Sequence, residues 1–110
     1  MADWEDDTDS IDGGQTGIAT ETKKKVEKPP RFKVLLHNDD FTTMEFVIMV
    51  LKAVFHKSDA EAFKIMMAVH NAGVGVAGVY AFEIAEAKVS KATELARSNE
   101  YPLLCTLEEE

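Results

Sequence analysis

The sequence predicts an α+β fold with two layers, in which three helices cover one face of a three-stranded sheet. Three apolar runs are short enough to be strands, and three longer segments repeat their apolar side chains at the spacing of a buried helix face. In chain order these segments predict the pattern β-α-α-β-α-β. A sheet of so few strands needs its helices on one face. The predicted strands are 32–37, 74–80 and 103–107, and the predicted helices are 44–55, 58–72 and 82–98.

Length and composition describe one small domain with a modest core. The chain has 110 residues, of which 45% are hydrophobic and 29% are charged, an ordinary balance for a globular protein. Its net charge of −8 argues against nucleic acid as a partner, because phosphate binding requires clustered Lys and Arg. No run approaches the ~20 apolar residues of a membrane span, and the N-terminus has no apolar signal segment. We therefore expect a cytoplasmic protein that does not bind membranes.

The N-terminal part of the chain differs in composition from the rest. Residues 1–22 contain seven acidic and no basic side chains, whereas residues 23–33 contain six basic side chains and one acidic. Such a segment cannot bury enough apolar area to offset the entropy lost on ordering. Pro29 and Pro30 then form a stiff, extended spacer. We expect a disordered tail over 1–30 and a folded domain over 31–107.

The turn after the first strand leads into a well-marked helix start. Thr42 and Glu45 have the spacing of a capping box, and Phe41 and Phe46 have the spacing of a hydrophobic staple around it. These signals place the turn 38–40 between the end of a strand and a fixed helix start. Asn and Asp are common in turns because they hydrogen-bond their own backbone. On spacing alone, turn formation is the favoured interpretation of Asn-Asp-Asp.

The second helix and the second strand are bounded by similar signals. Ser58 and Glu61 form a second capping box, and Gly73 ends the helix as a left-handed glycine. The glycines of the second strand, Gly75 and Gly78, lack the lysine of a phosphate-binding loop. They predict a bulge or a close approach of another backbone.

The last helix and strand complete the predicted layers. The third helix carries charged residues on one face and is expected to bury Phe82, Ala85, Val89, Ala92 and Leu95 or Ala96. Pro102 separates this helix from the third strand. Residues 108–110 are expected to form a frayed end.

The sequence contains residues that could act in an enzyme, but they do not form a recognisable catalytic pattern. Asp39 and Asp40 are adjacent, so their side chains diverge rather than face each other as an acid and a base. The nucleophile pattern G-x-S-x-G is absent, and the only cysteine, Cys105, lies in an apolar run typical of an inert core thiol. These two carboxylates could in principle bind a metal together with His37 and His70. However, the sequence has no local ligand spacing such as H-E-x-x-H. We expect no catalysis, no metal and no other cofactor.

A binding pocket fits the residues better. Met44 and Met66 lie on the apolar faces of neighbouring helices. Methionines at helical spacing are usually core residues, but their thioether chains also repack around different apolar guests. Asn38, Asp39 and His70 at the mouth of such a pocket would accept a group with several donors and a positive charge. A free α-amino group, with a pKa of ~7.7–8.0, is such a group.

The stretch from Lys33 to Val47, KVLLHNDDFTTMEFV, resembles the signature of ClpS, the bacterial adaptor of the Clp protease. The segments 68–70, 78–80, 83–89 and 102–107 are similar to later blocks of that family and have its spacing. The resemblance covers about residues 29–108, whereas the N-terminal tail is typically variable in the family. It therefore implies the ClpS fold for the whole predicted domain.

The resemblance also implies a function. ClpS proteins recognise N-degrons, which are substrates whose first residue is Leu, Phe, Tyr or Trp, and hand them to the unfoldase ClpA for degradation by ClpP. By this resemblance Asn38, Asp39 and His70 would hold the α-amino group, and Glu83 and Lys88 would contact the N-terminal domain of the unfoldase. The residues that would line or support the side-chain pocket are Asp40, Thr42, Met44, Val47, Met66 and Leu103. We expect a monomeric adaptor.

Two kinds of departure from the family pattern stand out. Thr43 occupies a position where the family commonly has proline, and this change could loosen the start of the helix. Met67 and Ala77 also differ from the residues common in the family, and these changes could alter the floor of the pocket. The alternative is an interaction domain of ribosomal-stalk-like topology that binds partners through its helix surface. The combination of Asn38, Asp39 and His70 favours the adaptor.

Overall fold

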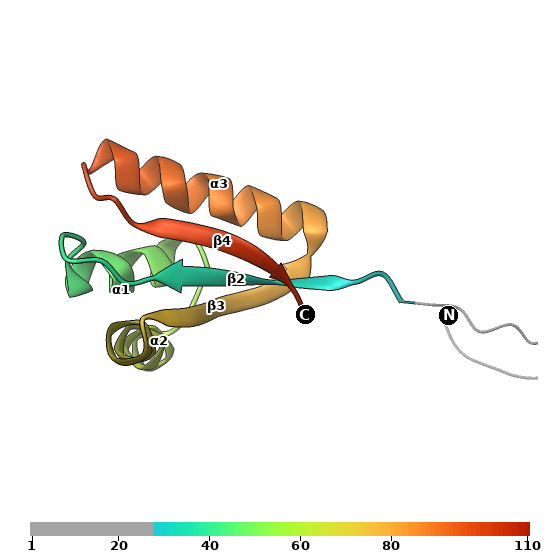
Figure 1. Ribbon diagram of the computed structural model, residues 1–110, viewed down its shortest axis with the longest axis horizontal. Coiled ribbons are helices and arrows are strands. Elements are labelled where there is room, and N and C mark those ends of the chain that lie inside the picture. Colours follow the sequence, from blue (N-terminus) through green and yellow to red (C-terminus); the bar gives the residue numbers. More distant parts are fainter. Residues whose placement is uncertain (1–27) are drawn as a thin grey trace, which may run out of the picture.

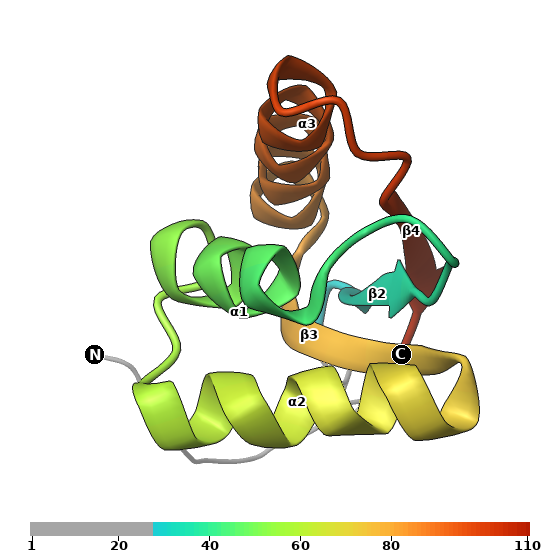
Figure 2. The same ribbon diagram turned by 90° about the vertical axis from the view of Figure 1, so that its left-hand side faces the viewer.

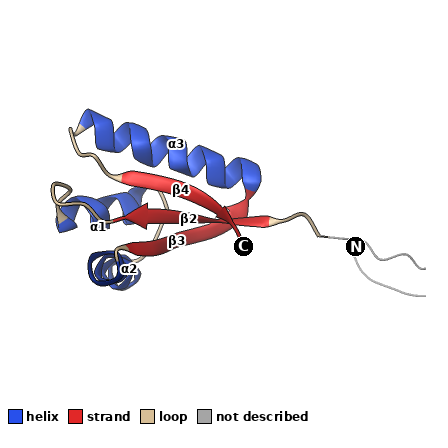
Figure 3. Cartoon of the chain, in the orientation of Figure 1, coloured by secondary structure: helices blue, strands red, loops and turns tan. Residues whose placement is uncertain are grey.

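The computed structural model describes residues 28–110, and the predictions for residues 1–27 lie outside the described residues. Six elements follow one another in the predicted order β-α-α-β-α-β, which confirms the α+β fold (Figures 1 and 3). None of the helices in the described range is long and apolar enough to cross a membrane. The elements are β2 (Arg31–His37), α1 (Met44–Ala53), α2 (Asp59–Ala72), β3 (Val74–Ala81), α3 (Phe82–Ser98) and β4 (Leu104–Glu109).

The sheet is antiparallel, with the strand order β3-β2-β4. Side chains of the central strand β2 alternate between its faces, and Val34 and Leu36 on one face have no exposed surface. The helices gather around that face, α2 beside β3 and α3 across the sheet (Figure 2). The opposite face bears Val76 and Leu104, both exposed. The predicted two-layer arrangement is therefore correct.

The glycines of β3 mark a bulge and a close approach, as predicted. Val34 pairs with Gly78 but Leu35 pairs with Val76, so Ala77 is an extra residue in the ladder. Gly75 lies under α2, where a Cβ atom would stand 2.7 Å from Cγ2 of Val69. The absence of a side chain at Gly75 therefore allows α2 to pack closely on β3.

The start of α1 differs from the prediction. The N-cap is Thr43, whose Oγ1 accepts a hydrogen bond from the backbone N–H of Phe46 at 3.1 Å. Thr42 instead belongs to the turn, because its backbone N–H and its hydroxyl both donate to the Asp39 carboxylate. Phe41 is 76% exposed whereas Phe46 is buried, so no hydrophobic staple forms. The predicted capping box of Thr42 with Glu45 and the predicted staple are wrong.

The connection between α1 and α2 follows the sequence signals more closely. α1 ends at Ala53 rather than at Phe55, because His56 takes a left-handed conformation with φ 57°. The capping box of Ser58 and Glu61 is present, and Gly73 ends α2 with φ 87°. The predicted start and end of α2 are therefore confirmed, whereas the predicted end of α1 is two residues too late.

The last two elements bring two corrections. Phe82 is 44% exposed, so its predicted burial is wrong. It stands at the first turn of α3, where its ring meets the ring of Phe32 edge-on, with centroids 5.2 Å apart. β4 runs to Glu109, which pairs with Phe32, and Glu110 donates its backbone N–H to Arg31 at 2.8 Å. The expected frayed end is therefore wrong, because the start of β2 supplies hydrogen-bond partners for it.

Candidate functional site

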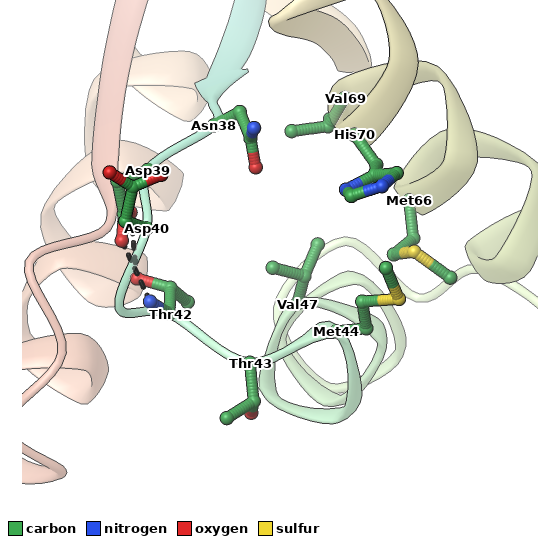
Figure 4. A pocket seen from close by; sticks show the side chains of 10 residues that line it. All are labelled: Asn38, Asp39, Asp40, Thr42, Thr43, Met44, Val47, Met66, Val69 and His70. Carbon is green, nitrogen blue, oxygen red and sulfur yellow. Dashed lines mark hydrogen bonds between the residues drawn. The ribbon is translucent and has the colours of Figure 1, made fainter.

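A cavity of about 350 Å³ opens where the loop after β2 meets the first turn of α1 and the second half of α2 (Figure 4). This volume is in the range of small-ligand pockets. The fold brings two distant segments of the chain together here, 38–47 and 66–70. The lining residues are Asn38, Asp39, Asp40, Thr42, Thr43, Met44, Val47, Met66, Val69 and His70.

The Asp39 carboxylate organises the loop at one side of the cavity. Its Oδ1 accepts hydrogen bonds from the backbone N–H groups of Phe41 (2.8 Å) and Thr42 (2.7 Å), and its Oδ2 accepts one from the Thr42 hydroxyl (2.8 Å). Burial raises the pKa of Asp39, but these hydrogen bonds outweigh it and the pKa is lowered from its ordinary value. Asp39 is therefore an anion at neutral pH. Since a carboxylate has about four acceptor positions, one remains for a ligand.

Asn38 and His70 stand across the mouth of the cavity from each other. Figure 4 shows the Asn38 amide directed toward the His70 ring, with open space between them. The backbone N–H of Asn38 donates to the carbonyl oxygen of Gly73 at 2.9 Å. This hydrogen bond ties the backbone of Asn38 to the end of α2, the helix that carries His70.

The inner wall of the cavity is apolar. Met66, Val47 and Val69 are buried, whereas Met44 at the start of α1 is 42% exposed. The two thioether side chains point toward each other (Figure 4). The site therefore combines a polar rim, which includes a carboxylate, with an adaptable apolar interior.

The family model for the ATP-dependent Clp protease adaptor protein ClpS matches residues 27–106 of this chain. The chain belongs to the ClpS family. It is 52% identical over 101 residues to the ClpS adapter of Roseobacter denitrificans, with 92% of this chain and 89% of the relative covered. It is 55% identical over 93 residues to the ClpS adapter of Desulfatibacillum aliphaticivorans, with 84% of this chain and 89% of the relative covered.

A solved structure is similar in fold to this ClpS-family chain. It is Agrobacterium tumefaciens ClpS2 bound to L-phenylalaninamide, with a TM-score of 0.73 and 43% sequence identity. The similarity covers 76% of this chain and 100% of that one.

Most residues expected from the ClpS resemblance lie together at the cavity, but Leu103 does not line it. Leu103 is 5% exposed and packs in the core just before β4. Two lining residues were not predicted, Thr43 and Val69. Val69 could have been found, because it follows Met66 by three positions and so shares its helix face.

The two residues expected at the unfoldase contact lie on α3, away from this cavity. Glu83 and Lys88 border a second cavity of about 310 Å³ between α3 and the end of α1, together with Val54 and Ile84. The Lys88 ammonium donates to the Val54 carbonyl oxygen at 2.8 Å and lies 5.4 Å from the centre of the Tyr80 ring. Lys88 therefore also joins α3 to the C-terminal end of α1.

Among residues 28–110, no group of three His, Cys, Asp or Glu side chains is placed to hold a metal ion. His37 was a candidate metal ligand together with Asp39 and His70. Its Nε2 instead forms a hydrogen bond of 2.8 Å with Oγ1 of Thr106. Cys105 is buried, and burial raises its pKa to about 11. Its thiol is therefore protonated at neutral pH and poorly nucleophilic.

Proposed function

We propose that this ClpS-family adaptor binds proteins whose first residue is Leu, Phe, Tyr or Trp and delivers them to a ClpA-type unfoldase for degradation. The observation that carries the proposal is the cavity of segments 38–47 and 66–70, where polar acceptors surround the mouth of an apolar interior. Such a site matches an N-terminal residue, which joins a cationic amine to a large apolar side chain. The similar structure from Agrobacterium tumefaciens is bound to L-phenylalaninamide, a molecule with both groups.

The ammonium group of the substrate has three N–H donors and needs three acceptors. The free acceptor position of the Asp39 carboxylate supplies one, together with the charge that offsets that of the amine. The amide oxygen of Asn38 and a ring nitrogen of His70 supply the others. The hydrogen bond between Asn38 and Gly73 joins the loop backbone to the end of α2, and the hydrogen bonds from Phe41 and Thr42 hold the Asp39 carboxylate, which reduces the entropy lost on binding.

The substrate side chain enters between Met44 and Met66. Val47 and Val69 close the interior, and Asp40 and Thr42 flank the mouth on the loop side (Figure 4). Burying a side chain the size of Leu or Phe contributes about 1.5–3 kcal/mol. This contribution ranks substrates once the amine is anchored, and it is absent for small or polar first residues.

In this proposal the adaptor performs no catalysis, and the energy for unfolding comes from its partner. A monomer docks on the N-terminal domain of the unfoldase through the surface around Glu83 and Lys88. That surface is carried by α3 and the end of α1, whereas the substrate cavity is carried by the β2–α1 loop and α2. The adaptor can therefore hold both partners at the same time.

Fluorescence anisotropy with two labelled peptides tests the proposal. One peptide begins with a free Phe, and the control has the same sequence with an acetylated N-terminus. We expect saturable binding of the free peptide and a loss of at least about tenfold on acetylation, the equivalent of ~1.4 kcal/mol. Equal binding of both peptides, or of neither, would contradict amine recognition and favour the alternative of an interaction domain that uses its helix surface.

A further inference from the structure

We propose that Gly75, which does not line the cavity, determines the size of the substrate side chain that the cavity accepts. The inference rests on the function proposed above. It concerns the contact between α2 and β3, where the absence of a side chain at Gly75 leaves space for Val69 in the cavity wall.

Gly75 faces α2 from the core side of the sheet, where it pairs with Leu36. A Cβ atom on Gly75 would lie 2.7 Å from Cγ2 of Val69, 3.3 Å from its backbone nitrogen and 3.4 Å from the carbonyl oxygen of Ile65. The first distance is far below van der Waals contact, so an alanine here forces Val69 to move.

Val69 is both the nearest neighbour of Gly75 and a residue of the cavity wall (Figure 4). Rotation of its side chain offers little relief, because valine in a helix strongly prefers one χ1 rotamer. An added methyl group therefore displaces Val69 away from β3 and toward the cavity. Since protein interiors are close-packed, this displacement reduces the space for the largest side chains first.

Gly78 provides a matched control on the same strand. A Cβ atom there would lie 2.3 Å from the Tyr80 hydroxyl oxygen, at the far end of that side chain, and Tyr80 does not line the cavity. Gly75→Ala and Gly78→Ala therefore introduce the same group into two crowded sites on one strand. Only the first site adjoins the cavity wall.

The experiment measures the affinities of peptides beginning with Trp and with Leu for the full chain and both variants. For Gly75→Ala we expect the ratio of the Trp Kd to the Leu Kd to rise by about threefold or more, the equivalent of ~0.65 kcal/mol. For Gly78→Ala we expect an unchanged ratio, whatever the loss of thermal stability. In Val69→Ala the obstructing methyl groups are absent, so adding Gly75→Ala to Val69→Ala should leave the ratio of that single variant unchanged.

An unchanged ratio in folded Gly75→Ala, or an equal rise in Gly78→Ala, would overturn the inference while the proposed function stands. Failure of the parent chain to bind either peptide would overturn the proposed function, and this inference with it. If Gly75→Ala does not fold, Val69→Ala decides: a smaller side chain in the cavity wall should lower the ratio of the Trp Kd to the Leu Kd, and an unchanged ratio would overturn the inference. A raised ratio in Val69→Ala/Gly75→Ala relative to Val69→Ala would show that Val69 does not transmit the effect, and would also overturn it.

Discussion

At the scale of single residues, Asp39 combines a structural role in the turn with the role in amine binding that we propose. Its carboxylate accepts three hydrogen bonds from Phe41 and Thr42, which is the turn role that spacing favours for Asn-Asp-Asp. The same group stays charged at the rim of the cavity, which is what amine binding requires. Because the native pKa is lowered, its contribution to the free energy of unfolding is complete above the ordinary carboxyl pKa of ~3.9 and is lost as the pH falls through the native value.

Two substitutions of Asp39 separate these tasks. Asp39→Asn keeps an oxygen that accepts from the Phe41 and Thr42 backbone and removes the charge. Asp39→Ala removes both. We expect each to weaken binding of an N-terminal Phe peptide by more than about tenfold, in line with the ~1.5–3 kcal/mol of a charged hydrogen bond. Both should lower the denaturation midpoint, because the charged carboxylate contributes to stability, and Asp39→Ala should lower it more, because it also removes the hydrogen bonds of the turn. Full affinity in Asp39→Asn would show that the charge is not used.

Met44 should set the shape rule for the substrate side chain. It stands partly exposed at the cavity entrance opposite buried Met66, where it would collide with branching next to the backbone of Ile or Val. Leu, Phe and Tyr branch further out and pass. Met44→Ala should therefore admit peptides beginning with Ile and Val, measured by anisotropy beside Leu. If Ile and Val remain excluded, another residue sets the rule.

At the scale of elements, the sequence predicts the type and order of the six helices and strands in residues 28–110 but not every end. Periodicity identifies α3 over its full length, and Ser58 and Gly73 define the ends of α2. The start of α1 was missed because two adjacent threonines can each cap a helix. Thr42 is held in the turn by hydrogen bonds from its backbone N–H and its hydroxyl to Asp39, three residues before it, and capping spacing does not include such a contact.

The resulting N-cap at Thr43 makes a stability prediction. Thr43→Val removes the hydroxyl that accepts from the Phe46 N–H and keeps the size of the side chain. The free energy of unfolding should fall by about 0.5–2 kcal/mol, as for other lost N-caps. Urea denaturation measures this change. Thr42→Val is the control, and it should leave the N-cap intact and affect substrate binding instead. An equal loss of stability in Thr42→Val would show that both hydroxyls fix the helix start.

At the scale of the whole molecule, only part of the candidate site could be predicted from the sequence. Local spacing pointed to Met44 and Met66, and the ClpS resemblance supplied the roles of Asn38, Asp39 and His70. What spacing could not supply is the distance between segments 38–47 and 66–70, which depends on α2 packing on β3. Leu103, expected from the resemblance to line or support the pocket, packs in the core and does not line the cavity.

The N-terminal segment should be needed for delivery and not for binding. Within the described range 28–110, the residues that line the cavity lie between Asn38 and His70, and we expect that deleting residues 1–25 leaves the affinity for a Phe peptide within about twofold, or ~0.4 kcal/mol. An extended segment of 30 residues reaches up to ~100 Å, long enough for an unfoldase to grip while the domain stays docked. The deletion should abolish ATP-dependent degradation of an N-degron substrate by the reconstituted protease. Degradation at the full rate would show that docking and the cavity suffice.

The most direct test of substrate binding in the cavity follows the backbone amide NMR signals of the full chain as L-phenylalaninamide is added. The proposed function predicts saturable shifts concentrated in residues 38–47 and 66–70, and none with the N-acetylated compound at the same concentrations. Shifts confined to the surface around Glu83 and Lys88, or no saturable shifts at all, would contradict it.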